Sequence, residues 1–231
     1  QAGSRNTSVL TYTLNWSRLN DPIEPSNGYR LQFTQGFAGI GGDVRYVRSE
    51  FNGAVYRPFF PGLLGDDVVA SFTMNGGFVL PWGGDSVRIN DRFFKGGNSF
   101  RGFEVAGIGP RAVSRDPDTG ELIRGDALGG RLYAVGALEV SFPLGLPEQY
   151  GVRGSLFTEF GTLGMLDSAD QVDEGTNAVF TVDDLALRAS AGLSIFWDSP
   201  FGPVRFDFAQ AFIREDYDRA EFFRFSTRTG F

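Results

Sequence analysis

Alternation of apolar and polar residues recurs along nearly the whole chain and constrains its fold more than any other feature. In residues 187–198, Leu, Ala, Ala, Leu, Ile and Trp alternate with Arg, Ser, Gly, Ser, Phe and Asp. A period of two places successive side chains on opposite faces of a β-strand. Turn-forming Gly, Pro and Asn residues separate the runs, so we predict an all-β, antiparallel meander. The other alternating runs are 10–16, 29–37, 47–55, 68–80, 132–142, 152–160, 204–208 and 223–231.

The length of these runs and the chemistry of their faces indicate the environment. We expect about eight or nine strands, most longer than the ~5–6 residues usual in globular proteins and suited to the ~9–11 residues that cross a bilayer. The polar face is rich in Ser, Thr, Asn, Gly and Arg, whereas large aromatics such as Trp16, Trp82 and Trp197 lie near strand ends. This pattern predicts a transmembrane β-barrel with aromatic girdles and a polar lumen. Periodicity alone leaves a soluble β-sandwich or a lipocalin-like barrel as the alternative.

Composition excludes several kinds of chemistry. The chain has Cys 0 and His 0, so it offers no imidazole base, thiolate nucleophile or disulfide. Its net charge is -7, so it lacks the excess of basic residues that is typical of nucleic-acid binders. We therefore expect no enzyme activity, catalytic residue, metal, cofactor or nucleic-acid partner. Residues 167–184 are acidic, but their spacing matches no EF-hand, which favours a solvated loop over a calcium site.

One long segment, residues 83–130, separates two groups of alternating runs. Its first half places Phe93, Phe100 and Phe103 among glycines, which predicts a loop that folds back into the lumen. Its second half, residues 114–126, is charged and is expected to be exposed. About nine strands do not form the even-numbered barrel usual for a single bacterial chain. We therefore interpret the chain as part of a larger barrel.

Residues 92–103 (RFFKGGNSFRGF), followed by Gly-Ile-Gly-Pro at 107–110, resemble the sixth-loop signature of the BamA superfamily. This superfamily includes outer-membrane protein assembly factors, TamA, two-partner secretion transporters and the mitochondrial sorting and assembly barrel. The resemblance continues through 127–130, 138–143 and 198–203. It implies that 1–231 is a single barrel domain or fragment, similar to the C-terminal half of a sixteen-stranded barrel, without the family's N-terminal POTRA domains. The signature residues carried over are Gly96, Gly97, Arg101, Gly102 and Phe103.

The resemblance also implies roles for individual residues. Arg101 is expected to reach into the lumen and pair with Glu139 and Glu159, and the strand alternation likewise places both carboxylates on the polar face. Anchoring of the loop and direct handling of substrate are the two roles open to Arg101. Aromatic residues of the last strand resemble the C-terminal assembly signal of bacterial barrels and would form a weak lateral seam. The residues of this seam are Phe223, Phe225, Gly230 and Phe231.

The function implied is a non-enzymatic factor of the bacterial cell outer membrane. It would fold and insert other outer-membrane proteins through a lateral seam and local membrane disturbance. Its expected partners are outer-membrane lipids, unfolded outer-membrane proteins and accessory assembly lipoproteins. A TamA-like or two-partner secretion translocator and a passive porin are the alternatives. The sequence leaves open whether this piece closes alone, pairs with a second copy or belongs to a longer chain.

Overall fold

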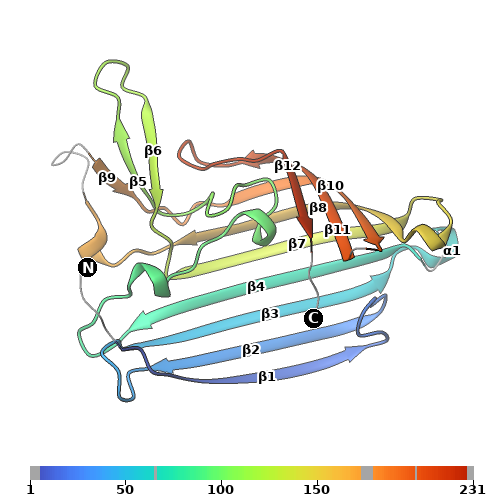
Figure 1. The fold of residues 1–231 in the computed structure, drawn as a ribbon, viewed down its shortest axis with the longest axis horizontal. Coiled ribbons are helices and arrows are strands. Elements are labelled where there is room, and N and C mark those ends of the chain that lie inside the picture. Colours follow the sequence, from blue (N-terminus) through green and yellow to red (C-terminus); the bar gives the residue numbers. More distant parts are fainter. Residues whose placement is uncertain (1–5, 65–66, 173–178, 201, 228–231) are drawn as a thin grey trace.

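A computed structural model describes residues 6–64, 67–172, 179–200 and 202–227, and nine of its strands form one antiparallel sheet (Figure 1). The order in the sheet is β1-β2-β3-β4-β7-β8-β10-β11-β12. The predicted all-β antiparallel fold is therefore confirmed. The strands are β1 (Val9–Leu19), β2 (Gly28–Ala38), β3 (Tyr46–Pro58), β4 (Val69–Pro81), β7 (Leu132–Pro143), β8 (Val152–Gly164), β10 (Arg188–Ser199), β11 (Gly202–Ile213) and β12 (Phe223–Thr227).

Helices are short. The described elements are α1 (Pro61–Leu64) and the 3-10 turns η1 (Ile89–Asp91), η2 (Gly97–Ser99), η3 (Glu148–Tyr150) and η4 (Ser168–Asp170). Within the described ranges, no helix has the length and apolar character needed to cross a membrane.

Three further strands form a second sheet in the order β6-β5-β9. They are β5 (Arg111–Arg115), β6 (Leu122–Ala127) and β9 (Val179–Val182). We expected loops at 83–130 and 167–184 and predicted no strand there, whereas the structure places β5 and β6 in the first and β9 in the second. Val113, Phe180 and Tyr217 bury a small core there, and Phe180 and Tyr217 come from connections far from β5 in sequence. Strands of four to six residues are too short for their alternation to be recognised in the sequence, and their pairing partners are brought together only by the fold.

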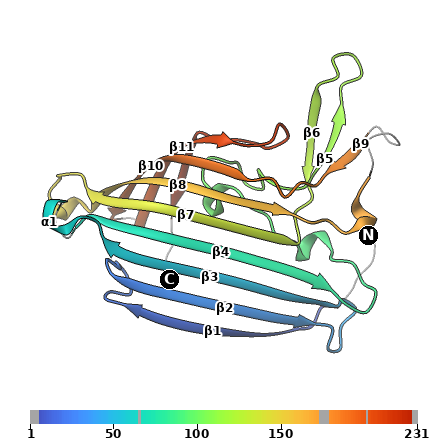
Figure 2. The ribbon, with the colours of Figure 1, turned by 180° about the vertical axis from the view of Figure 1, so that it is seen from behind.

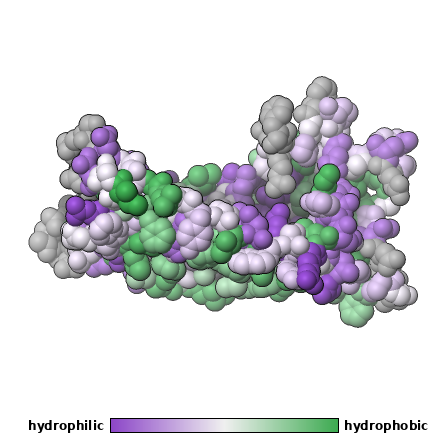
Figure 3. Space-filling model, turned by 90° about the horizontal axis from the view of Figure 1, so that it is seen from below, coloured by the Kyte–Doolittle hydropathy of each residue, from purple (hydrophilic) through white to green (hydrophobic). Residues whose placement is uncertain are grey.

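The two faces of the large sheet differ as the alternation predicts. Leu193 is 42% exposed on the outer face, whereas the next residue, Ser194, is 1% exposed on the inner face. Figure 3 shows hydrophobic residues gathered in a band along one side of the molecule. Figures 1 and 2 both show the segment between β4 and β7 lying against the other face of the sheet. An apolar outer face and a polar inner face suit a barrel wall between lipid and lumen.

The two longest connections, 82–131 and 165–187, leave the same end of the sheet (Figure 1). We call this the long-connection end. In outer-membrane barrels the long loops are extracellular and the short turns periplasmic. The long-connection end is accordingly the extracellular one.

Candidate functional site

The signature loop, residues 92–110, owes its shape to glycines in the left-handed region. Gly96 has a φ of 127° and Gly102 a φ of 85°. A Cβ on Gly96 would lie 1.9 Å from the carbonyl oxygen of Glu104, and one on Gly102 would lie 2.8 Å from the Cβ of Ser190. Gly97 has a φ of 59° and lies against the guanidinium of Arg224. Side chains at these positions would push the loop off the sheet or distort its turn.

Two phenylalanines seat the loop on the inner face of the sheet. Phe100 and Phe103 are fully buried, and their ring centroids lie 5.0 Å apart in an edge-to-face arrangement. They belong to a core that also contains Ile108, Phe93 and Tyr133. The backbone N–H of Gly97 donates to the carbonyl of Phe103 across 2.8 Å, which closes the turn. The loop is thus an ordered plug with its own hydrophobic core.

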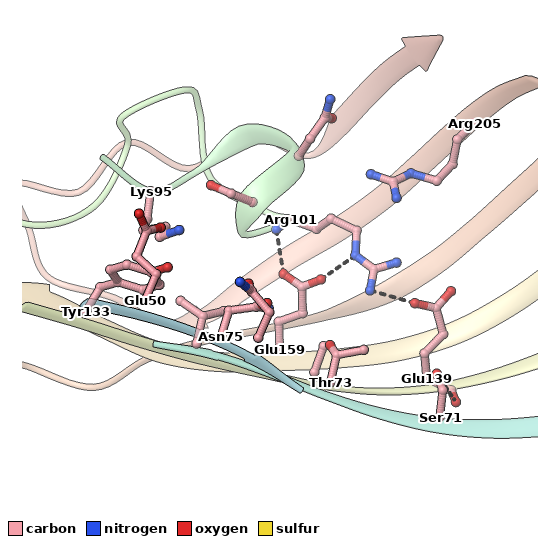
Figure 4. Close-up of a pocket in the computed structure, with 15 residues that line it drawn as sticks. Glu50, Ser71, Thr73, Asn75, Lys95, Arg101, Tyr133, Glu139, Glu159 and Arg205 are labelled. Carbon is pink, nitrogen blue, oxygen red and sulfur yellow. Dashed lines mark hydrogen bonds and ion pairs between the residues drawn. The ribbon is translucent and has the colours of Figure 1, made fainter. Parts of the chain in front are cut away.

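Arg101 projects from this plug onto two neighbouring strands (Figure 4). Its Nε donates to Oε1 of Glu159 at 2.5 Å, and its Nη2 donates to Oε2 of Glu139 at 2.8 Å. Its backbone N–H donates to Oε2 of Glu159 at 2.7 Å, and its Nη1 donates to Oγ of Ser194 at 3.1 Å. The guanidinium also lies 3.5 Å from the ring centroid of Phe157. The planar fork of arginine bridges two carboxylates in a way that the single ammonium of lysine cannot reproduce.

At this site one guanidinium, that of Arg101, lies against two carboxylates, those of Glu139 and Glu159. Burial alone lowers the pKa of Arg101, but Glu159 and Glu139 outweigh burial and raise the pKa above its ordinary value. In the pairing of β7 with β8, Glu139 lies opposite Phe157 and Ala137 opposite Glu159, so the carboxylates are diagonal neighbours on one face. Arg101 therefore holds together two like charges that would otherwise repel.

Sequence reasoning missed the outer part of this network. Ser190 Oγ donates to the carbonyl of Arg101 at 2.6 Å, and Ser194 Oγ donates to Oδ1 of Asp207 at 2.5 Å. Asp207 also accepts from Nε of Arg205 at 2.8 Å. The network thus ties the loop to β7, β8, β10 and β11. Its signal in the sequence was the placement of these residues on the same polar face as Glu159.

A second set of contacts joins the signature loop to the residues that lead into the last strand. The backbone N–H of Glu104 donates to the carbonyl of Arg219 at 2.9 Å, and that of Arg219 donates to the carbonyl of Gly107 at 2.8 Å. The N–H of Glu221 donates to the carbonyl of Gly102 at 3.0 Å. Residues 219–221 thus pair with the loop immediately before β12 begins.

The predicted seam residues are only partly within the described chain. Phe223 and Phe225 are exposed on the outer face of β12, where their rings lie beside those of Phe208 and Phe206. Gly230 and Phe231 lie outside the described residues.

The connection before β12 is held by a second buried arginine, which the sequence did not single out. Arg188 Nε lies 3.0 Å from Oδ2 of Asp218, and both side chains are 0% exposed. Arg188 Nη2 donates to the hydroxyl of Tyr217 at 3.0 Å. Burial raises the pKa of Tyr217 to about 12.

A hollow of about 460 Å³ lies between the loop and the inner wall (Figure 4). Amides, hydroxyls and charged groups line it, and Lys95 reaches over the ring of Tyr133 at 3.7 Å. Burial lowers the pKa of Lys95. This lining suits a water-filled lumen. It consists of Glu50, Asn52, Ser71, Thr73, Asn75, Lys95, Asn98, Ser99, Arg101, Tyr133, Val135, Ala137, Glu139, Glu159 and Arg205.

Asp167 and Asp183, in the described part of the acidic connection between β8 and β10, bond within the protein. Asp183 accepts from the backbone N–H groups of Met165 at 2.8 Å and Leu166 at 2.6 Å. Asp167 lies 2.8 Å from Arg131. The part of the chain that the structure describes contains no group of three or more acidic residues arranged to hold a metal ion. These carboxylates order the connection.

Gly102 provides a test of how closely the loop packs. We expect Gly102→Ala to loosen the loop at a cost of about 1–3 kcal/mol, because the new methyl group meets Ser190 and the backbone is left-handed. Limited proteolysis and hydrogen exchange across residues 92–110 would measure the change. Gly120→Ala is the matched control, since Gly120 has a φ of 72° but no atom within 4 Å of the new Cβ. Equal loosening by both variants would contradict the packing argument.

An apolar outer face, a polar inner face and an inward plug bonded to the wall define a section of a transmembrane β-barrel of the bacterial outer membrane. The family model for the Omp85 superfamily domain matches residues 1–231. The chain belongs to the Omp85 superfamily.

Individual relatives agree with this assignment. The chain is 35% identical over 224 residues to the outer membrane protein assembly factor BamA of Neorickettsia risticii (strain Illinois), covering 97% of this chain and 27% of that protein. It is 32% identical over 159 residues to the sorting and assembly machinery component 50 homolog of Mus musculus, covering 68% and 30%. The crystal structure of BamA from Haemophilus ducreyi lacking POTRA domains 1–3 matches with a TM-score of 0.76 and 25% identity, covering 94% of this chain and 41% of that one.

The chain spans less than a third of the length of these two curated relatives. The predicted resemblance to a BamA-type barrel is confirmed, and the alternative of a soluble sandwich or a lipocalin-like barrel is wrong.

Proposed function

We propose that this chain is the barrel section of a factor that folds and inserts other outer-membrane proteins through a lateral seam beside β12. The names of its BamA and sorting-machinery relatives support the assembly role. The observation that carries the proposal for the seam is the position of the signature loop. The loop bonds to the inner wall through Arg101 and also to residues 219–221, which immediately precede β12.

The edge of the sheet supports a mechanism by strand pairing. Within the described residues, β12 pairs with β11 from Val204↔Thr227 to Phe208↔Phe223, where its ladder stops although β11 continues to Ile213. A short edge strand separates at low cost, and its exposed N–H and C=O groups can pair with an incoming strand. The exposed Phe223 and Phe225 would disturb the adjoining lipid. Such a mechanism needs no catalytic side chain.

In this proposal Arg101 anchors the loop and does not handle the substrate. Its side chain is 5% exposed. Its Nε, Nη1, Nη2 and backbone N–H all donate to groups of the wall. Each of the three guanidinium nitrogens therefore already donates to the wall, and the burial of the side chain leaves little of it accessible to an incoming strand.

The proposed partners follow from the same mechanism. They are unfolded outer-membrane proteins at the seam, lipids along the aromatic outer face and accessory assembly lipoproteins.

Reconstitution tests the function. We expect liposomes that contain the full-length protein to fold an added outer-membrane barrel faster than empty liposomes, scored by protease protection and heat-modifiable gel mobility. Planar-bilayer conductance on the same preparation is the second measurement. Large steady currents without faster folding would identify a passive porin, and export of a soluble passenger would identify a secretion translocator.

A further inference from the structure

A second hollow, of about 440 Å³, opens at the long-connection end between β6, the signature loop and the residues before β12. We call it the arginine pocket. It shares no lining residue with the hollow around Arg101. Its lining consists of Glu104, Leu122, Arg124, Arg214, Asp218, Arg219 and Ala220.

Two of the three arginines of this pocket, Arg124 and Arg219, are held by backbone carbonyls. Arg124 Nε donates to the carbonyl of Asp216 at 2.8 Å, and Arg219 Nη2 donates to the carbonyl of Gly125 at 3.2 Å. Among the residues that the structure describes, no ion pair includes Arg124, Arg214 or Arg219. Carbonyls fix the direction of a guanidinium without cancelling its charge. The pocket therefore keeps a local excess of positive charge in a chain whose net charge is -7.

The carboxylates near the pocket do not remove this excess. Asp218 is buried and already pairs with Arg188, and it also accepts from the backbone N–H of Glu215 at 2.8 Å. Glu104 remains at the exposed rim, as one carboxylate against three guanidiniums.

A fourth arginine, Arg111, lies next to the arginine pocket, where it shares the carbonyl of Gly125 with Arg219. Arg111 is 2% exposed, and its Nη1 and Nη2 donate to the carbonyls of Gly125 and Ala106. Its Nε finds no acceptor among the described residues. Burial and then the positive charge of Arg219 lower the pKa of Arg111. This side chain adds to the positive field that an anion in the pocket would meet.

We propose that the arginine pocket binds a phosphate group at the extracellular surface. Guanidinium forks match phosphate oxygens in a bidentate geometry, and several of them around one hollow recruit a doubly charged anion more strongly than a carboxylate. Leu122 and Ala220 provide an apolar wall, and Glu104 can accept a hydroxyl hydrogen from a sugar that carries the phosphate. The phosphate can come from a phosphorylated saccharide or from free inorganic phosphate. The site is independent of the proposed assembly function.

Calorimetry on the full-length protein in a non-ionic maltoside detergent tests this site. Glucose 6-phosphate, inorganic phosphate and glucose are the three probes, at low and at high salt. We expect glucose 6-phosphate to bind, with affinity falling as salt rises, and glucose to give no heat of binding. Removing one charged hydrogen-bond donor with Arg214→Gln should weaken binding about tenfold. Arg214 is exposed and makes no described hydrogen bond, so this change leaves the fold intact.

The controls separate the pocket from general charge effects. Arg30→Gln removes an exposed arginine of β2 outside the pocket and should leave the affinity unchanged. Hydrogen exchange should slow across residues 214–222 when the phosphate compound is added. Tighter binding of glucose 6-phosphate than of inorganic phosphate would identify a saccharide as the source, and equal binding would identify free phosphate. If neither phosphate compound binds, or if wild type, Arg214→Gln and Arg124→Gln bind with equal affinity, the proposal is overturned.

Discussion

Arg101→Ala is expected to release the signature loop from the inner wall. The substitution removes both ion pairs and leaves Glu139 and Glu159 as facing carboxylates without their shared counter-charge. Breaking a buried pair by removing one partner costs about 3–5 kcal/mol, and water in the lumen lowers that value. Hydrogen exchange and protease sensitivity across residues 92–110 should rise sharply in the full-length protein. Because residues 219–221 bond to the loop, we expect faster exchange there as well.

Two further variants isolate the cause. Arg101→Lys keeps the positive charge but loses the planar guanidinium that bridges both carboxylates. The protection of residues 92–110 from protease should therefore lie between that of wild type and that of Arg101→Ala. Arg153→Ala removes a half-exposed pair with Glu24 outside the loop and should leave loop protection unchanged. A double-mutant cycle with Glu159→Gln should give a large coupling energy. Unchanged protease protection of the loop in Arg101→Ala would refute the anchoring role.

Arg188→Met is expected to unfold the connection that precedes β12. The change leaves Asp218 charged in a site where its side chain is 0% exposed, and it removes the donor to the hydroxyl of Tyr217. The expected cost is about 3–5 kcal/mol. Thermal denaturation in detergent and hydrogen exchange across residues 214–222 would measure it.

An exposed ion pair provides the contrast. Arg153 and Glu24 lie 2.5 Å apart, but their side chains are 47% and 55% exposed. Arg153→Met should therefore cost only about 0–1 kcal/mol. The double variant Arg188→Met/Asp218→Leu should be more stable than Arg188→Met alone, because it leaves no buried charge without a partner. Equal losses for Arg153→Met and Arg188→Met would show that burial does not set the value of these pairs.

Much of the wall and the centre of the site could be predicted from sequence. Alternation located the strands of the large sheet, because a period of two is a local property of each strand. It also placed Glu139 and Glu159 on the polar face, and the family resemblance assigned Arg101 as their partner. Ser194 and Asp207 were within reach too, since the tight turn between β10 and β11 sets them opposite each other. Ser194 was missed because serine on a polar face carries no distinctive signal.

Other features could not be predicted for a physical reason. The sheet β6-β5-β9 brings together two segments separated by the whole of β7 and β8. The burial of Arg188 against Asp218 depends on how the connection before β12 folds over the start of β10. The arginine pocket needs β6, the signature loop and residues 214–220 to meet at one end of the sheet. These contacts join segments that are far apart in the sequence, so no pattern within one segment predicts them.

The sequence by itself determined the class of fold, the outward face and the identity of the plug, because each depends on residue period or on a contiguous motif. The family resemblance named Glu139 and Glu159 as partners of Arg101, and only the tertiary structure decided how these contacts are made and what else the plug touches. It showed that the fork of Arg101 spans two strands and that the same loop pairs with residues 219–221 before β12. Side-chain chemistry names the possible partners of a buried charge, but the distances that select among them arise when the strands pair and the loop folds inward.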